Sequence, residues 1–178
     1  MEHADEILIL TGPPGSGKTT TAQALAREPG AAKVHLHADD FWHFIRNGAI
    51  APYLPEAQAQ NTVVVDVLAK AAEGYARGGY FVVVDGIVGP WFLEPFKRTT
   101  VPLHYVVLRP PLGEAIRRCR ERGGNTLSDP VPIASLYRQL SSLGDLERHA
   151  LATDGWSREE TLGAVIQAVR SREFLLAR

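Results

Sequence analysis

The stretch Gly12-Pro13-Pro14-Gly15-Ser16-Gly17-Lys18-Thr19 decides how this sequence is interpreted. It fits the pattern G-x-x-x-x-G-K-[ST] in full, and it lies between the apolar run at residues 7–10 and a segment with helical periodicity. Glycines let successive backbone N–H groups turn toward phosphate oxygens, and a helix start adds a favourable dipole. The stretch therefore predicts a phosphate-binding loop. A glycine-rich turn that binds nothing is disfavoured, because motif and context agree.

The motif assigns a role to each of its polar side chains. Lys18 is expected to reach the β- and γ-phosphates of a nucleotide, and the Thr19 hydroxyl is expected to hold Mg²⁺. The predicted nucleotide-binding residues are Gly12, Pro13, Pro14, Gly15, Ser16, Gly17, Lys18, Thr19 and Thr20. Binding of a nucleotide does not by itself name a reaction.

Outward from this loop, apolar runs alternate with helical patterns along the whole chain. The predicted strands are residues 7–10, 34–37, 80–84, 103–108 and 150–153, and the predicted helices are residues 19–27, 56–77, 112–122, 133–143 and a last one capped by Ser157 and Glu160. Strands that alternate with helices indicate an α/β fold with a parallel sheet covered on both faces. We expect one domain over residues 1–178, with a short lid at about residues 112–130.

Composition excludes several other classes of protein. With 178 residues, 45% hydrophobic and 22% charged, the chain suits one packed domain and not a disordered one. The formal net charge of −1 gives no bulk attraction to nucleic acid. A single cysteine, Cys119, allows no internal disulfide, and no apolar run approaches membrane-spanning length. We expect a cytoplasmic protein, monomer or homodimer, without membrane contact.

Acidic residues follow two of the predicted strands. Asp85 ends the run at residues 81–84, where a carboxylate can order the Mg²⁺ shell; the alternative is a residue that caps the turn at Gly86. Asp39 and Asp40 follow residues 34–37, where one could orient an acceptor hydroxyl while the other caps a helix. If the sheet is parallel, all three lie at one edge.

The helix predicted at residues 112–122 is rich in arginine. Arg118 and Arg122 lie one helical turn apart and could clamp a transferring phosphoryl group. Arg117 and Arg120 are better explained as a solvated face that pairs with Glu114 and Glu121. The loop at residues 123–129 could act as a moving lid that excludes water.

Taken together, these residues resemble a group of small phosphate-loop kinases that includes gluconate kinase, shikimate kinase, chloramphenicol phosphotransferase and polynucleotide 5′-kinases. The similar layout runs from about residue 7 to 172, and the phosphate loop is its specific motif. The resemblance implies a three-layer P-loop NTPase fold, ATP and Mg²⁺ as cofactors, and Asp39 as the acceptor-orienting carboxylate. It also implies that Arg118 and Arg122 belong to a lid helix, and that residues 152–154 border adenine.

The differences from this group narrow the range of possible phosphate acceptors. Trp42 stands where polynucleotide 5′-kinases have an arginine, which disfavours a nucleic acid acceptor, and no [NT]-K-x-D signature of a GTPase is present. Several aromatic side chains and Arg46 are expected near the carboxyl edge of the sheet. The aromatic side chains could enclose a small ring or sugar, or they could pack in the core. They are Phe41, Trp42, Phe44, Tyr53 and those of the turn at residues 88–92.

His35 and His37 project to one side of a predicted strand and suggest a metal pair when taken in isolation. Strand packing or hydrogen bonding around the site explains them more simply, because oxygen ligands suit Mg²⁺. The sequence as a whole predicts a kinase that phosphorylates a hydroxyl group of a small molecule, such as a sugar acid or an antibiotic. The alternatives are a nucleotide or nucleic acid 5′-end kinase and a regulatory module that binds ATP without transfer.

Overall fold

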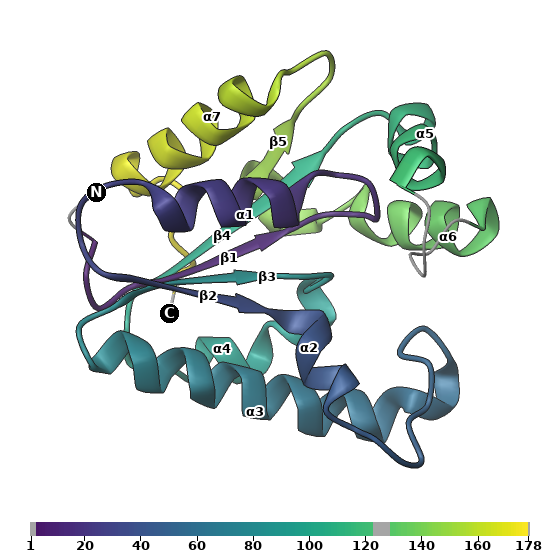
Figure 1. Cartoon of the computed structure of the whole chain (residues 1–178), viewed down its shortest axis with the longest axis horizontal. Helices are drawn as coiled ribbons and strands as arrows, with labels where there is room; N and C mark the ends of the chain where they lie inside the picture. The colour runs from purple at the N-terminus through teal and green to yellow at the C-terminus, as the bar shows by residue number, and fades with distance from the viewer. Residues whose placement is uncertain (1–2, 123–128, 178) are drawn as a thin grey trace.

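A parallel five-stranded sheet forms the centre of the molecule, in a computed structural model that describes residues 3–122 and 129–177 (Figure 1). Its strands are β1 (Ile7–Thr11), β2 (Lys33–His37), β3 (Phe81–Asp85), β4 (Leu103–Arg109) and β5 (Ala150–Ala152). They lie in the order β2-β3-β1-β4-β5, and every pair of neighbours is parallel. The α/β fold with five parallel strands is therefore confirmed.

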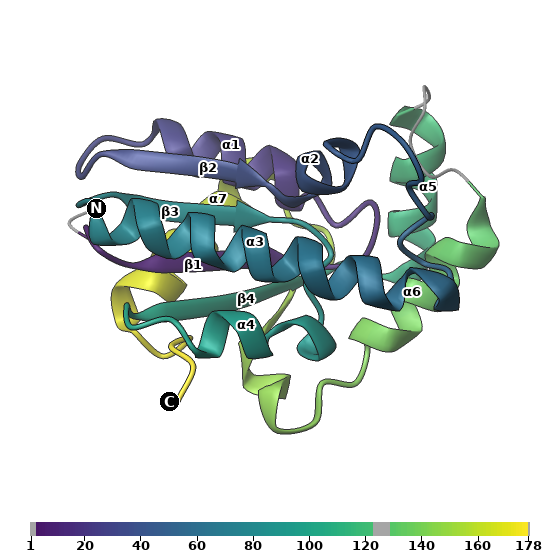
Figure 2. The ribbon, with the colours of Figure 1, turned by 90° about the horizontal axis from the view of Figure 1, so that it is seen from below.

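Helices cover both faces of this sheet and give the molecule three layers. Figures 1 and 2 show α1 (Lys18–Arg27) and α7 (Arg158–Ser171) on one face, and α3 (Gln58–Arg77) and α4 (Glu94–Lys97) on the other. Three further helices lie toward the carboxyl ends of the strands: α2 (Ala38–His43), α5 (Leu112–Arg122) and α6 (Pro130–Leu140). The described residues also form the short 3₁₀ helices η1 (Pro55–Ala57), η2 (Pro90–Phe92) and η3 (Gly144–His149).

The two core clusters follow from the alternation of side chains along the strands. Ile7 and Ile9 pack with Leu68 of α3, whereas Leu8 and Leu10 pack with the side chains of α1 and α7. Because both faces of the sheet are covered, the central strands β1 and β3 are fully buried and read as continuous apolar runs. The edge strand β2 is only half-buried, which explains how it accommodates Lys33, His35 and His37.

Helix boundaries differ from the predicted ones where proline and capping residues act. α6 begins at Pro130, three residues before the predicted start, because Asp129 accepts a hydrogen bond from the backbone N–H of Val131 and proline suits a first helical turn. Residues 130–132, predicted as loop, are thus helical. The predicted capping box of Ser157 and Glu160 is present in α7. The short helix α4 was not predicted, and most of the predicted lid loop, residues 123–128, lies outside the described residues.

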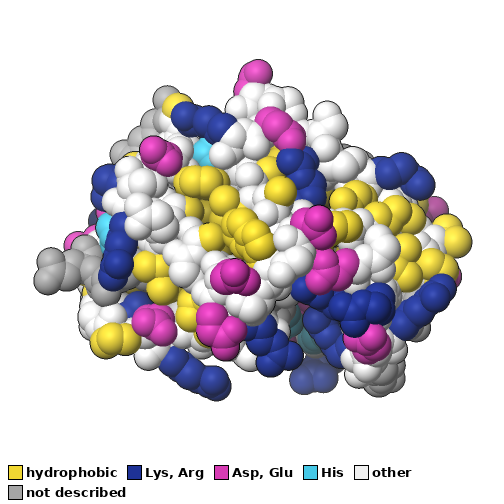
Figure 3. Space-filling view, turned by 90° about the horizontal axis from the view of Figure 1, so that it is seen from above, with side chains coloured by type: hydrophobic (Ala, Val, Ile, Leu, Met, Phe, Trp, Pro, Cys, Tyr) yellow, Lys and Arg dark blue, Asp and Glu magenta, His cyan; other side chains and the backbone are white. Residues whose placement is uncertain are grey.

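The surface carries charges of both signs. Figure 3 shows the face that α1 and α7 cover, where Lys and Arg side chains alternate with Asp and Glu and several basic side chains lie toward the α5 end. None of the described helices is long and apolar enough to cross a membrane.

Candidate active site

The phosphate loop, residues 12–19, connects β1 to α1 at the carboxyl edge of the sheet. Gly15 and Gly17 have φ angles of 78° and 88°, which L side chains rarely adopt. A Cβ at Gly12 would lie 2.3 Å from the backbone oxygen of Leu108, and one at Gly15 would lie 2.2 Å from that of Ala115 in α5. The glycines are therefore required both by backbone conformation and by close packing.

Lys18 is the first residue of α1, and its side chain lies over the loop. Its ammonium donates one long hydrogen bond to the backbone oxygen of Pro13 at 3.4 Å. Burial lowers the pKa of Lys18, while the carboxylates of Asp39 and Asp85 oppose that shift. The ammonium thus has weak partners within the protein and two acidic groups within electrostatic range, an arrangement that suits a cation meant for phosphate oxygens.

Asp85, the last residue of β3, is completely buried and contacts Thr19 across the sheet edge. The Thr19 hydroxyl donates to Asp85 Oδ2 at 2.6 Å. A hydroxyl and a carboxylate are oxygen ligands of the kind that Mg²⁺ prefers, so this pair, drawn from two separate elements, fits the cation that a phosphate-loop fold implies.

Two histidines of β2 hold the other oxygen of Asp85. His35 Nε2 donates to Oδ1 at 2.5 Å and His37 Nδ1 donates to it at 3.0 Å. Burial by itself would raise the pKa of Asp85, but the hydrogen bonds from His35, His37 and Thr19 hold that pKa well below its ordinary range. The hydrogen bond to Asp85 in turn raises the pKa of His37. Asp85 is therefore ionised and fixed in one orientation.

Sequence reasoning placed His35 and His37 on one side of the strand but did not identify their partner. The signal that could have found it is the register of β2 against β3, which sets His37 directly opposite Asp85. Residues that lie opposite each other in neighbouring parallel strands point to the same face of the sheet. His35, His37 and Asp85 all point to the face that α1 covers.

Asp39 and Asp40 lie in the first turn of α2, and both are exposed. His37 is the residue before the helix, and no side chain caps it, so the capping alternative for these aspartates is not observed. Asp39 Oδ2 is 3.7 Å from His37 Nε2, and the charge of Asp39 acts on Lys18. Asp39 is thus the aspartate linked to the loop through both His37 and Lys18.

α5 packs against the phosphate loop and brings arginines to it. Arg118 Nη1 donates to the backbone oxygen of Gly15 at 3.5 Å, and its other nitrogen pairs with Glu114. Arg122 is exposed, yet its charge contributes to lowering the pKa of Lys18. Arg117 pairs with Glu121 at 2.8 Å on the solvent side, as the predicted solvated face requires.

The aromatic residues predicted for an acceptor pocket form two groups of unequal exposure. Trp42 and Phe92 pack at 6.4 Å between ring centroids and border the core, whereas Phe44 and Tyr53 are 67% and 60% exposed. Arg46 is also exposed. Trp91 covers Gly89, where a Cβ would lie 2.3 Å from its ring.

Two polar residues of α3 that sequence reasoning missed fasten the loop between α2 and α3. Asn61 accepts from Trp42 Nε1 at 2.7 Å and donates to the backbone oxygen of Pro52 at 2.8 Å. Gln60 exchanges two hydrogen bonds with the backbone of Ile50. The aromatic residues of this loop are therefore held near α2 by side chains whose roles depend on tertiary contacts.

On the other side of the sheet edge, β5 leads into residues 152–154, which the resemblance assigns to the border of adenine. Thr153 is buried, and its backbone N–H donates to the backbone oxygen of Arg109 at 3.3 Å. Its hydroxyl has no hydrogen-bond partner among the described residues.

Comparisons with known proteins identify a family and similar folds. The model of the AAA domain family matches residues 7–146. A search of curated proteins found no match. Among solved structures, a sugar kinase from Janibacter sp. HTCC2649 is similar with a TM-score of 0.70 and 18% identity, over 93% of this chain and 94% of that one.

Two further solved structures have similar folds. A gluconokinase from Sinorhizobium meliloti 1021 has a TM-score of 0.64 and 17% identity, over 97% of this chain and 99% of that one. A shikimate kinase from Acinetobacter baumannii, in complex with shikimate, has a TM-score of 0.64 and 20% identity, over 94% of each chain. At these identities the likeness establishes the fold.

Proposed function

The chain belongs to the AAA domain family and has the fold of small phosphate-loop kinases, and on that premise we propose that it transfers the γ-phosphoryl group of ATP to a hydroxyl group of a small molecule. The observation that carries the proposal is the 2.6 Å contact of Thr19 with Asp85 beside a glycine-shaped loop and Lys18. This contact supports the proposal because it joins the two residues proposed to hold the metal, at the edge of the sheet where the phosphate loop lies.

In this proposal the phosphate loop and Lys18 hold the nucleotide. Backbone N–H groups of residues 12–19 point at phosphate oxygens, and Lys18 shifts from the Pro13 carbonyl to the β- and γ-phosphates, because a charged phosphate is the stronger acceptor. Thr19 and Asp85 would hold Mg²⁺, which would supply positive charge against the phosphate oxygens.

Asp39 orients the acceptor. Its carboxylate accepts a hydrogen bond from the acceptor hydroxyl and directs that oxygen toward the γ-phosphorus. Because the transition state of phosphoryl transfer is loose, correct positioning matters more than a strongly raised pKa. The exposure of Asp39 leaves room for an acceptor that arrives from solvent.

Arg118 and Arg122 stabilise the transferring group from the α5 side. Arg118 already contacts the loop at Gly15 and is paired with Glu114, which holds its guanidinium in place. On binding, these cations face the negative charge that the equatorial oxygens carry during transfer, the part that an arginine finger plays.

The experiment that tests this proposal measures ATP consumption across sugars, sugar acids, antibiotics, nucleosides and a 5′-hydroxyl oligonucleotide, with product mass to locate the phosphate. We expect transfer to a small-molecule hydroxyl. Asp39→Asn should lower turnover by about 10²–10³-fold while ATP affinity persists, and the adjacent Asp40→Asn serves as the matched control. Preferred transfer to the oligonucleotide would support the 5′-end kinase instead. ATP binding without transfer to any acceptor would support a regulatory module.

A further inference from the structure

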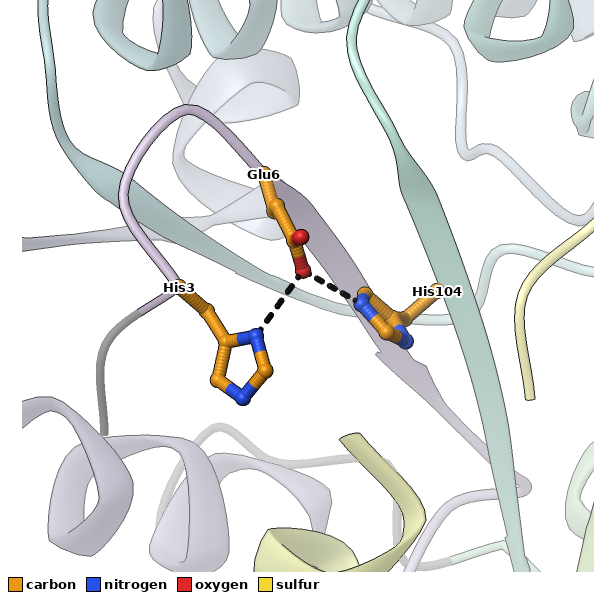
Figure 4. A group of neighbouring side chains, drawn as sticks. All are labelled: His3, Glu6 and His104. Carbon is orange, nitrogen blue, oxygen red and sulfur yellow. Dashed lines mark hydrogen bonds and ion pairs between the residues drawn. The ribbon is translucent and has the colours of Figure 1, made fainter. Parts of the chain in front are cut away.

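A second cluster of ligand-type side chains lies at the opposite edge of the sheet from the phosphate loop. Glu6 directly precedes β1, His104 is the second residue of β4, and His3 lies on the segment that leads into β1 (Figure 4). Glu6 Oε2 is 2.7 Å from His104 Nε2 and 3.2 Å from His3 Nδ1. Figure 4 shows the carboxylate between the two imidazole rings.

The donor atoms of this cluster have the spacing of a metal site. All three lie within 4.8 Å of one another. Two ligands of a tetrahedral Zn²⁺ at about 2.0–2.1 Å from the ion are about 3.3–3.4 Å apart. The separations from Glu6 fall short of this by less than about 1 Å, so a small movement of the imidazoles would admit the ion. His3 directly precedes a short turn in the segment before β1, where the backbone is less constrained than within a strand.

The surroundings orient the carboxylate toward the imidazoles. Arg172 Nη1 donates to the other oxygen, Oε1, at 2.6 Å, which leaves Oε2 directed at His3 and His104. Carboxylate ligands of metals are commonly hydrogen-bonded in this way through their second oxygen. His104 is completely buried, and among the described residues only its Nε2, the atom that faces Glu6, has a partner.

We propose that His3, Glu6 and His104 bind one Zn²⁺ ion and leave a fourth position open to water. Two imidazoles and one carboxylate are the donor set of a zinc site with an open position, whereas Mg²⁺ prefers oxygen ligands only. The proposal is independent of the proposed kinase function, because the cluster lies at the other end of β1 from the phosphate loop. A bound ion joins the N-terminal segment to β4 and, through Arg172, to the end of α7.

The test uses the untagged full chain, stripped of metal with a chelator and titrated with Zn²⁺ by calorimetry. We expect one ion per chain. His3→Gln should weaken binding by about 100-fold or more, because even the groups that support a ligand contribute about 10–100-fold. Glu6→Gln should have the same effect, and His43→Gln, at an exposed histidine of α2, is the matched control that binds as the unmodified chain does.

Two further readouts separate a metal site from a hydrogen-bonded network. Co²⁺ should give the intense visible absorption of a tetrahedral complex in the unmodified chain and lose it in His3→Gln. At about 100 times the dissociation constant, Zn²⁺ should raise the melting temperature by about 5 °C or more, and not in His3→Gln. His3→Gln is the main variant because His3 lies outside the sheet, before β1, so its change should disturb folding less than a change at the completely buried His104.

Three results would overturn the proposal. The first is the absence of stoichiometric Zn²⁺ binding by the unmodified chain. The second is Zn²⁺ binding by His3→Gln and Glu6→Gln that is as tight as binding by the unmodified chain. The third is loss of binding in Asp85→Asn alone, which would assign the zinc to the phosphate-loop edge. In each case the three side chains form a hydrogen-bonded network only.

Discussion

Both edges of the sheet contain a carboxylate that contacts two histidines, but the two carboxylates differ in their remaining partner. At the carboxyl edge, Asp85 accepts from His35, His37 and the Thr19 hydroxyl. At the amino edge, Glu6 contacts His3 and His104 and accepts from the guanidinium of Arg172.

The difference lies in the third partner of each carboxylate. Glu6 has a built-in cation in Arg172, so this carboxylate is compensated within the fold. Asp85 has a neutral hydroxyl in the same position and depends for its cation on what the site binds. From this comparison we propose that Glu6 acts on stability, whereas Asp85 acts on the proposed phosphoryl transfer.

The largest effect expected from this comparison is on catalysis by Asp85→Asn. An amide keeps the shape but removes the anionic metal ligand, so the rate of phosphoryl transfer should fall by about 10³-fold. Glu6→Gln, the matched change at the other edge, should leave the rate within about 2-fold. Initial rates with ATP and the acceptor found in the screen measure both. Equal losses in the two variants would contradict the division of roles.

The next largest effect is on stability, where the change at Glu6 is expected to matter more than the change at Asp85. Glu6→Ala leaves both ring nitrogens of the buried His104 without a partner among the described residues and removes the partner of Arg172, so the free energy of unfolding should fall by about 2–3 kcal/mol. Denaturant unfolding measures this loss, and the kcat of the surviving folded protein should remain close to that of the unmodified chain. A stable Glu6→Ala protein with reduced kcat would place Glu6 in the active site.

A smaller effect is expected when the histidines around Asp85 are changed. His35→Asn and His37→Asn should raise the Mg²⁺ concentration needed for half-maximal rate by about 10-fold, because Asp85 loses a donor that fixes its orientation. The KM for ATP at saturating Mg²⁺ should change little, which a general loss of structure would not reproduce. His43→Asn is the control. An unchanged Mg²⁺ requirement in both variants would show that Asp85 needs neither histidine.

The smallest effect is the contribution of each carboxylate to acid sensitivity. The folded-state pKa values of Glu6 and Asp85 are both lowered, although burial opposes the shift. At Glu6 the hydrogen bonds from His104 and Arg172 outweigh burial. At Asp85 the hydrogen bonds from His35, His37 and Thr19 do so. Each therefore contributes stability that is present above its unfolded pKa, 4.5 or 3.8, and is lost as pH falls through the folded pKa.

This sign gives a measurable difference between variants. Below pH about 4.5, the free energy of unfolding of Glu6→Gln should fall with decreasing pH less steeply than that of the unmodified chain. The two slopes should differ by an amount that corresponds to the uptake of up to about one proton. Asp85→Asn should show its difference at lower pH. Urea unfolding at a series of pH values measures both slopes. A steeper acid dependence in either variant would mean that the native structure does not favour the ionised carboxylate.

The sequence was sufficient to predict the sheet and the phosphate loop because their signals are local. The run at residues 7–10 is followed at once by glycines and a helical period, and the boundaries of residues 112–122 matched α5 completely. The position of Asp85 at the carboxyl edge was predicted because the last residue of a buried parallel strand lies at that edge of the sheet. These inferences need no knowledge of which strands are neighbours.

What the sequence did not reveal depends on contacts between distant segments. His35 and Asp85 are 50 residues apart, and Glu6 and His104 are 98 residues apart, so their pairing requires the strand order and register. Asn61 was unremarkable as one polar residue in a long helix until the fold placed Trp42 beside it. The roles predicted for all site residues stay predictions: Lys18, Thr19, Asp39, Asp85, Arg118 and Arg122.

The measurement that tests the central claim most directly is calorimetric titration of a non-hydrolysable ATP analogue with Mg²⁺ into the unmodified chain, Lys18→Ala and Glu6→Gln. The phosphate-loop edge is predicted to bind one nucleotide in the unmodified chain and in Glu6→Gln, and to lose this heat in Lys18→Ala. No heat from the unmodified chain, or equal heat from a correctly folded Lys18→Ala, would contradict the claim that this edge of the sheet is the nucleotide site.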